Sequence, residues 1–235
     1  MQHRLAAPFD SAPRLLGRSA QLFFRKLPFL AAVTLAIFLP GKLLFQLAGY
    51  FLDIPPEGIA SYILGDFSDL VLGSLTIPAA IYGLMSGAGV AESLRRGRTL
   101  WARMFWMRMK VEVTVALWSL LLFVPGIVAM VKLALTEPIV VLEPREPDPL
   151  ARSRELTEGR RWRVFFVAIP LLLLDLVGSF VVLSALPGVA HSRLLMALAD
   201  SAVAVVSMWT TVAGLLMYLG ILDAERTSGP PRPAR

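Results

Sequence analysis

Apolar residues occur in five long runs that short charged segments separate. The runs lie at about 27–52, 70–91, 111–142, 164–186 and 201–222. A bilayer core about 30 Å thick takes roughly 20 residues of helix to cross, and every run reaches that length. The pattern therefore predicts an all-α fold, a polytopic transmembrane helical bundle.

The run 111–142 differs from the others because it is long and contains Pro125 and Gly126 near its middle. Both of its flanks are basic, with six Lys and Arg residues in 92–110 and six in 143–163. Basic loops tend to stay in the cytoplasm. The chain must then cross the membrane an even number of times between these flanks.

We therefore predict a helical hairpin with arms 111–124 and 126–142 that turns at Pro125 and Gly126. At about 1.5 Å per residue the arms are about 21 and 25 Å long, which is short for a crossing. The hairpin is either a pair of short spans or a re-entrant hairpin that other helices shield from lipid. This interpretation brings the total to six membrane segments.

The distribution of basic residues also predicts the orientation of the bundle. Residues 1–26 hold five Lys and Arg residues, whereas the loop 53–69 holds none and is acidic. Placing the basic segments inside puts 20 of the 23 basic residues in the cytoplasm. Both termini are then cytoplasmic. Residues 1–226 form a single domain, and the Pro- and Arg-rich tail 227–235 is predicted to be disordered.

Two of the basic segments contain apolar stripes. Leu15 and Phe23 lie among arginines before the first run, and Trp101 and Met104 lie among arginines in 92–110. Apolar and aromatic residues opposite basic ones are typical of helices that lie in the headgroup layer. We expect these stripes to face the membrane surface or to anchor the neighbouring spans.

Composition excludes several classes of protein. Of 235 residues, 56% are hydrophobic and 17% are charged, whereas a soluble domain has about 25% charged residues. An ordinary soluble globule, a disordered chain and a coiled coil are excluded. There is no cysteine, and His3 and His191 are the two histidines, so we expect no metal or cofactor. The net charge of +6 is spread between apolar runs rather than gathered on one face, which excludes nucleic acid as a partner.

Three stretches together resemble a known family. They are FDSAPRLLGRSAQLFFRKLPF from Phe9, VPGIVAMVKLALTEPIVVLE from Val124 and PLARSRELTEGRRWRVF from Pro149. They look like the membrane-domain family of glycerophosphoryl diester phosphodiesterases and its standalone relatives. The resemblance implies a polytopic, usually six-spanning helical domain in the bacterial inner membrane. Some relatives add a soluble phosphodiesterase barrel. No barrel fits here, and we expect no enzymatic activity.

The segment after residue 147 has features of a short cytoplasmic helix. Asp148 before Pro149 is typical of an N-cap followed by a first-turn proline, and Gly159 is typical of a helix end. One hypothesis is a solvated helix that supports the next span. The other is a surface that binds anionic headgroups or a partner protein. The candidate residues for that surface are Arg152, Ser153, Glu155, Arg160, Arg161 and Trp162.

Ionisable residues inside apolar runs are costly and are functional candidates by default. Pairing across the bundle would join Lys132 to Asp175, or Glu137 to Lys42. One hypothesis is a polar substrate site at the hairpin, and the other is structural pairing together with snorkelling of basic side chains. The intramembrane polar candidates are Lys42, Lys132, Glu137, Glu143 and Asp175.

These observations favour a non-enzymatic membrane protein that binds lipids or a partner in envelope organisation or export. Its expected partners are membrane lipids, including anionic headgroups, or another membrane or export protein. The alternative is a membrane component of a transporter with a polar site at the 111–142 hairpin, since discontinuous helices often form substrate sites. A lipid-modifying enzyme is a third class, but the sequence contains no recognisable catalytic set.

Overall fold

The computed structural model describes residues 11–55, 58–185 and 192–228, and these residues form helices joined by short turns, without a strand. The predicted all-α class is therefore confirmed. Of the tail predicted to be disordered, the first two residues lie in the last helix, and the remainder falls outside the described residues.

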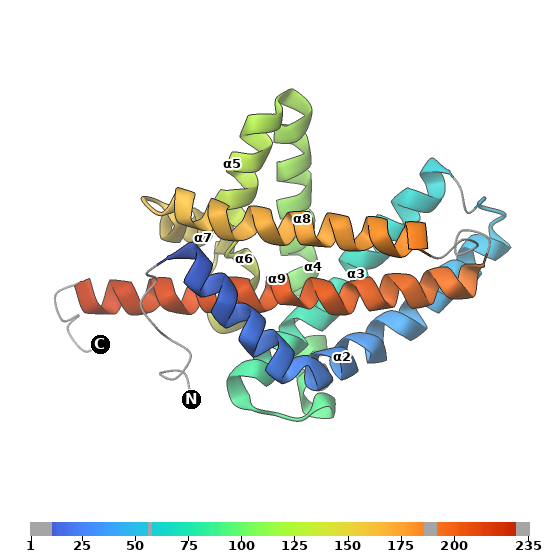
Figure 1. Ribbon diagram of the computed structural model, residues 1–235, viewed down its shortest axis with the longest axis horizontal. Helices are drawn as coiled ribbons and strands as arrows, with labels where there is room; N and C mark the ends of the chain where they lie inside the picture. Colours follow the sequence, from blue (N-terminus) through green and yellow to red (C-terminus); the bar gives the residue numbers. More distant parts are fainter. Residues whose placement is uncertain (1–10, 56–57, 186–191, 229–235) are drawn as a thin grey trace.

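The first helix, α2 (Ala12–Phe51), is 40 residues long. It begins well before the predicted first span and continues through Pro40. Pro28 and Pro40 both lie inside it, and each removes a helical hydrogen bond and crowds the preceding turn. The helix is bent rather than straight, as prolines cause (Figure 1).

Helices α3 (Ile59–Ser86) and α4 (Val90–Leu121) form a closely packed pair. Gly87 ends α3 with a φ of 72°, a left-handed conformation that glycine adopts readily. The turn therefore falls inside the predicted span 70–91. At Gly97 of α4 an added Cβ would lie 2.9 Å from the Cβ of Ala79. The missing side chain lets the two helices approach.

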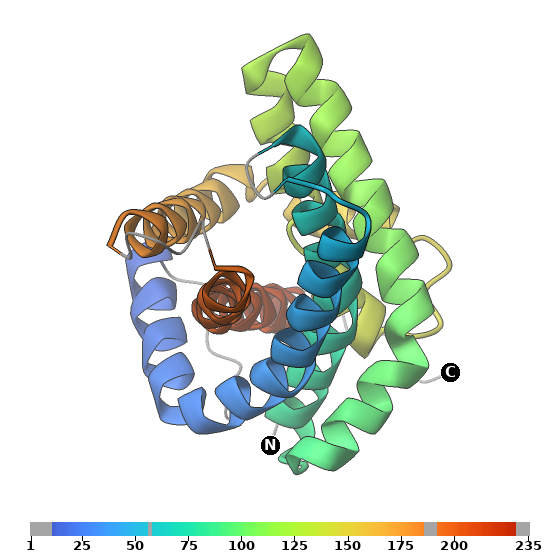
Figure 2. The same ribbon diagram turned by 90° about the vertical axis from the view of Figure 1, so that its right-hand side faces the viewer.

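Three helices complete the chain, α7 (Pro149–Thr157), α8 (Arg161–Ala185) and α9 (Arg193–Ser228). The Asp148 carboxylate accepts hydrogen bonds from two backbone N–H groups of the first turn of α7, each at 3.1 Å. This confirms the predicted N-cap. Helix α9 extends past the predicted span at both ends and lies at the centre of the bundle, with α2, α3 and α8 around it (Figure 2).

A helical hairpin is present, but it turns at Leu122 rather than at Pro125 and Gly126. Leu122 is extended and joins α4 to α5 (Phe123–Leu133), whose first turn contains Pro125 and Gly126. Proline is tolerated there because first-turn N–H groups have no helical partner. Gly126 packs against the other arm, where an added Cβ would lie 2.9 Å from the Cα of Ser119. The predicted turn position is wrong, and this glycine serves close packing instead.

The second arm of the hairpin is itself broken. Helix α5 ends at Leu133, and α6 (Thr136–Leu142) follows after a two-residue break. The tip of the hairpin is strongly apolar and exposed, with Leu120 85% exposed. Figures 1 and 2 show α5 and the end of α4 projecting across the direction of α8 and α9, which a pair of spans parallel to α9 would not do.

The two apolar stripes, expected to face the membrane surface or to anchor the neighbouring spans, pack largely against other helices, although Trp101 is 38% exposed. The ring of Phe23 is buried and stacks on Trp209 of α9 at 6.0 Å between centroids. Met104 is fully buried, and the indole N–H of Trp101 donates to the carbonyl of Val71 on α3 at 3.2 Å. Both stripes are tertiary contacts.

Four helical stretches among the described residues are long and apolar enough to cross a membrane. They are Ala12–Phe51, Ile59–Ser86, Val124–Leu142 and Leu194–Glu225. These are the features of a helical membrane protein. Six crossings and the cytoplasmic placement of both termini stay predictions.

Candidate functional site: an acidic cavity beside the hairpin

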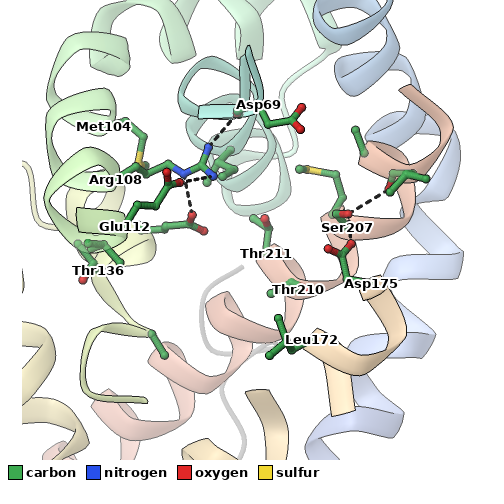
Figure 3. A pocket seen from close by; sticks show the side chains of 18 of the residues that line it. Asp69, Met104, Arg108, Glu112, Thr136, Leu172, Asp175, Ser207, Thr210 and Thr211 are labelled. Atoms are coloured by element: carbon green, nitrogen blue, oxygen red, sulfur yellow. Dashed lines mark hydrogen bonds and ion pairs between the residues drawn. The ribbon is translucent and has the colours of Figure 1, made fainter. Parts of the chain in front are cut away.

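A cavity of about 560 Å³ lies where α3, α4, α6, α8 and α9 meet. Sites for small molecules typically measure about 300–1,000 Å³. Figure 3 shows Arg108 and Glu112 on one wall and Asp175 and Ser207 on the opposite wall. We call this space the acidic cavity.

One face of α9 lines the acidic cavity over about four turns. The lining residues recur at intervals of three and four, which places them on one face of a helix. They extend over about 22 Å at about 1.5 Å per residue. The residues on this face are Met196, Ala199, Asp200, Val203, Ala204, Ser207, Met208 and Thr211.

Arg108 provides the positive charge on the hairpin side. Its guanidinium lies 3.4 Å from Glu112 and 3.5 Å from Glu137, and it donates to the backbone carbonyl of Asp69 at 3.3 Å. At Gly73 of α3 an added Cβ would lie 3.2 Å from the Cζ of Arg108. The glycine therefore leaves the space through which Arg108 joins α4 to α3 and α6.

The opposite wall has a carboxylate with a neutral partner. Asp175 of α8 accepts a hydrogen bond from the hydroxyl of Ser207 on α9. Among the described residues no Lys or Arg forms an ion pair with Asp175. Its negative charge is therefore available to the cavity.

Lys42 of α2 lies behind two of the carboxylates that line the acidic cavity. Its Nζ lies 2.7 Å from Asp69 of α3 and 3.2 Å from Asp200 of α9. The Lys42 side chain is 3% exposed, whereas those of Asp69 and Asp200 are 53% and 39% exposed. A buried charge requires such partners. We call these three residues the Lys42 triad.

The ionisable side chains around the cavity are mostly acidic. The five carboxylates that line it belong to Asp69, Glu112, Glu137, Asp175 and Asp200. Among the described residues two cations contact them, Lys42 and Arg108. With every group ionised, this leaves a formal excess of three negative charges. A concave site of one sign of charge concentrates ions of the other sign.

The cross-bundle pairs expected from the sequence are not the ones observed. Glu137 pairs with Arg108 rather than with Lys42. Asp175 is hydrogen-bonded to a serine and not to Lys132, and Lys132 does not line the cavity. Glu137 and Asp175 both line the cavity. The choice between a polar substrate site and structural pairing stays a prediction.

Arg152 is held in a cluster of acids rather than presented outward. Its guanidinium lies 2.8 Å from Glu155, 3.5 Å from Glu225 and 3.7 Å from Glu143. Burial lowers the pKa of Arg152, but the hydrogen bond to Glu155 and the three carboxylates outweigh it and raise the pKa above its ordinary value. Glu143 also accepts a hydrogen bond from the hydroxyl of Tyr218. This Arg152 clasp joins α7 to the ends of α6 and α9.

Ser153 is fully buried beneath the break between α5 and α6. Its hydroxyl donates to the carbonyl of Lys132 at 2.8 Å and accepts from the backbone N–H of Leu135 at 3.2 Å. A buried backbone group without a partner costs about 1–3 kcal/mol. Ser153 therefore supports the broken arm, and it is not accessible to a headgroup.

The remaining candidates of the α7–α8 segment differ in exposure. Glu155 is 69% exposed but belongs to the Arg152 clasp. Arg160 is half-buried, whereas Arg161 and Trp162 are exposed. The Trp162 ring stacks on Phe166 at 6.2 Å between centroids. Arg161 and Trp162 are thus the members of the predicted surface that face outward.

Sequence reasoning missed three charged residues of the site because it assigned them to loops. Each lies within three residues of a predicted span, so small changes in the span limits would have included them. The position next to an apolar run was the signal that could have found them. The three are Asp69, Arg108 and Asp200.

Among the described residues, no group of three or more His, Asp or Glu side chains is placed to hold a metal ion. No family model, curated protein or solved structure matches this chain. The resemblance to the phosphodiesterase membrane domains therefore stays a prediction.

Proposed function

We propose that this membrane protein is the membrane component of a transport system and binds a small cationic solute in the acidic cavity. The observation that carries the proposal is the excess of carboxylates around a cavity of about 560 Å³ inside an apolar helical protein. A positively charged solute would compensate that excess. The bacterial inner membrane and cytoplasmic termini belong to the same proposal.

The broken arm of the hairpin also supports a binding site. Leu133, Ala134 and Thr136, at the break between α5 and α6, line the cavity. Discontinuous helices often form the substrate sites of transporters. Glu137 follows the break directly and adds a carboxylate at the same place.

Thermal unfolding of the purified protein in nanodiscs tests the proposal. The probes are choline and its neutral carbon isostere, which have the same shape and differ in charge. We expect choline to raise the melting temperature in a saturable way, because a ligand that binds only the folded state stabilises it. The isostere should leave the melting temperature unchanged. Larger organic amines extend the series to the size limit of the cavity.

Variants locate the binding site. Asp175→Asn and Glu137→Gln should weaken choline binding, since each removes a negative charge from the cavity. Glu158→Gln is the matched control because Glu158 is exposed and lies outside the cavity. If no cation in the series stabilises the protein, or if all three variants behave alike, the proposed site is wrong.

A second candidate function is an anionic-lipid-binding module in envelope organisation or export. The exposed Trp162, stacked on Phe166 beside the exposed Arg161, favours it, because such residues suit the headgroup layer. Native mass spectrometry of the protein in its own lipids tests this function. We expect a bound anionic lipid that Arg161→Ala removes and that Arg152→Ala retains, since Arg152 is already neutralised by carboxylates. Equal loss in both variants would contradict this site.

A further inference from the structure

A second, small cavity lies on the other side of the Lys42 triad. It measures about 30 Å³, enough for about two water molecules. It is lined by α2, α3 and the segment between them, with Gln46, Ile54 and Ser61 among its residues. Asp200 lines both this cavity and the acidic cavity.

Different parts of α2 and α3 line the two cavities. On α2, Phe38 lines the acidic cavity, and Gln46 lines the small one. On α3, Ser61 lines the small cavity, and Gly73 lines the acidic one. Lys42 and Asp69 fall between these positions on their helices.

On α9, Asp200 lines both cavities, and residues on either side of it, from Met196 to Thr211, line the acidic cavity alone. The boundary between the cavities is therefore defined by α2 and α3, and Asp200 is the residue of α9 that the two cavities share. The small cavity lies on the side of the segment between α2 and α3, which the charge distribution predicts to be on the non-cytoplasmic side of the membrane.

We propose that Lys42, Asp69 and Asp200 form an ionic gate that closes the acidic cavity toward the segment between α2 and α3. The proposal rests on the proposed transport function. Lys42 is 3% exposed and lines the small cavity, and it pairs with Asp69, which lines the acidic cavity, and with Asp200, which lines both. Arg108 lies beside the triad, because its guanidinium donates to the backbone carbonyl of Asp69 at 3.3 Å, and the broken arm of the hairpin also lines the acidic cavity.

The charges of the gate suit a cationic solute. Removing Lys42 from its carboxylates without replacement would leave two neighbouring, partly exposed carboxylates without their cation, which is unfavourable. A cation that reaches Asp69 and Asp200 from the acidic cavity supplies the replacement charge. The solute thus favours the open gate because it takes over the ion pairs of Lys42, and differential binding of this kind shifts a two-state equilibrium.

The absence of cysteine from the chain allows a direct test by labelling of single cysteines. Val203→Cys reports on the acidic cavity, and Ser61→Cys reports on the small cavity. A membrane-impermeant thiol reagent is applied to one side at a time, using right-side-out and inverted membrane vesicles. With Lys42 present, we expect labelling of Val203→Cys from one side and of Ser61→Cys from the other.

Opening the gate should change that pattern. In a Lys42→Met background, labelling of Val203→Cys from the closed side should rise about tenfold or more, because the rate follows the population of the open state. A second background, Lys42→Met with Asp69→Asn and Asp200→Asn, leaves no unpaired charge and tests the gate if the single variant fails to fold. Lys132→Met is the matched control, since Lys132 lines neither cavity.

An unchanged pattern in the folded neutral variant would overturn the gate, as would labelling of Val203→Cys from both sides when Lys42 is present. The labelling requires no solute, so its outcome is separate from the choline measurement. If labelling shows that the gate opens in the Lys42 variants but choline does not bind, the proposed solute is wrong and the proposed gate is supported. If choline binds but the labelling pattern is unaltered in the Lys42 variants, the proposed gate is wrong and the proposed solute is supported.

Discussion

Lys42 and Arg152 are each held by several carboxylates, yet they lie in different surroundings. Lys42 is 3% exposed and contacts carboxylates from two other helices inside the bundle. Arg152 is 18% exposed, and its nearest partner, Glu155, is 69% exposed. Water can therefore replace the partners of Arg152 but has little access to Lys42.

This difference decides what each cluster does. Removing one partner of a buried ion pair costs about 3–5 kcal/mol, because the other charge stays buried without compensation. An exposed pair contributes about 0–1 kcal/mol. We therefore expect the Lys42 triad to hold its helices together more strongly than the Arg152 clasp holds α7.

The largest effect is expected at Lys42. Lys42→Met should lower the free energy of unfolding by about 2–4 kcal/mol, less than for a fully buried pair because the Asp69 and Asp200 side chains are partly exposed, measured by SDS titration in mixed micelles. Adding Asp69→Asn and Asp200→Asn should recover most of the loss, since the unpaired charges disappear. If Lys42→Met alone changes the free energy of unfolding by less than about 1 kcal/mol, Lys42 contributes no more to stability than an exposed ion pair does.

The next effect concerns the support beneath the broken hairpin arm. Ser153→Ala should cost about 1–3 kcal/mol, because the carbonyl of Lys132 and the N–H of Leu135 lose their partner. Hydrogen exchange at Leu135 should become faster. Thr99→Ala is the control, since the exposed Thr99 hydroxyl donates to a carbonyl of its own helix. If Ser153→Ala and Thr99→Ala lower the free energy of unfolding equally, Ser153 does not stabilise the break more than an ordinary helical hydroxyl would.

The smallest effects are expected in the Arg152 clasp. Arg152→Met should cost about 1 kcal/mol or less, and Glu155→Gln about 0.2–0.5 kcal/mol, as for other helical pairs of this spacing. The same SDS titration measures both. A loss at Arg152 as large as that at Lys42 would remove the distinction between the two clusters.

The sequence predicted the parts of the fold that depend on neighbouring residues. The helical membrane class follows from the length of the apolar runs, and the cap at Asp148 follows from residues within one turn. The hairpin was predicted from charge in its flanks, but its turn was misplaced. Gly126 meets the opposite arm at Ser119, and that contact is invisible in the local pattern.

The candidate site was predicted only in part. Glu137 and Asp175 were found because ionisable residues in apolar runs are conspicuous. Their partners could not be deduced, since Arg108 reaches α3 only through the space at Gly73. The role of Ser153 was likewise hidden, because the backbone groups it binds lie 18 and 21 residues away.

The sequence by itself determined that this protein is helical and suited to a membrane, because hydropathy and helix caps arise from short stretches of chain. Only the tertiary structure decided that Lys42, Asp69 and Asp200 meet, and that their meeting place lies between two cavities. Which helix faces come together depends on bends, glycine contacts and crossing directions summed over the whole bundle. The cavity and its closure are products of that packing.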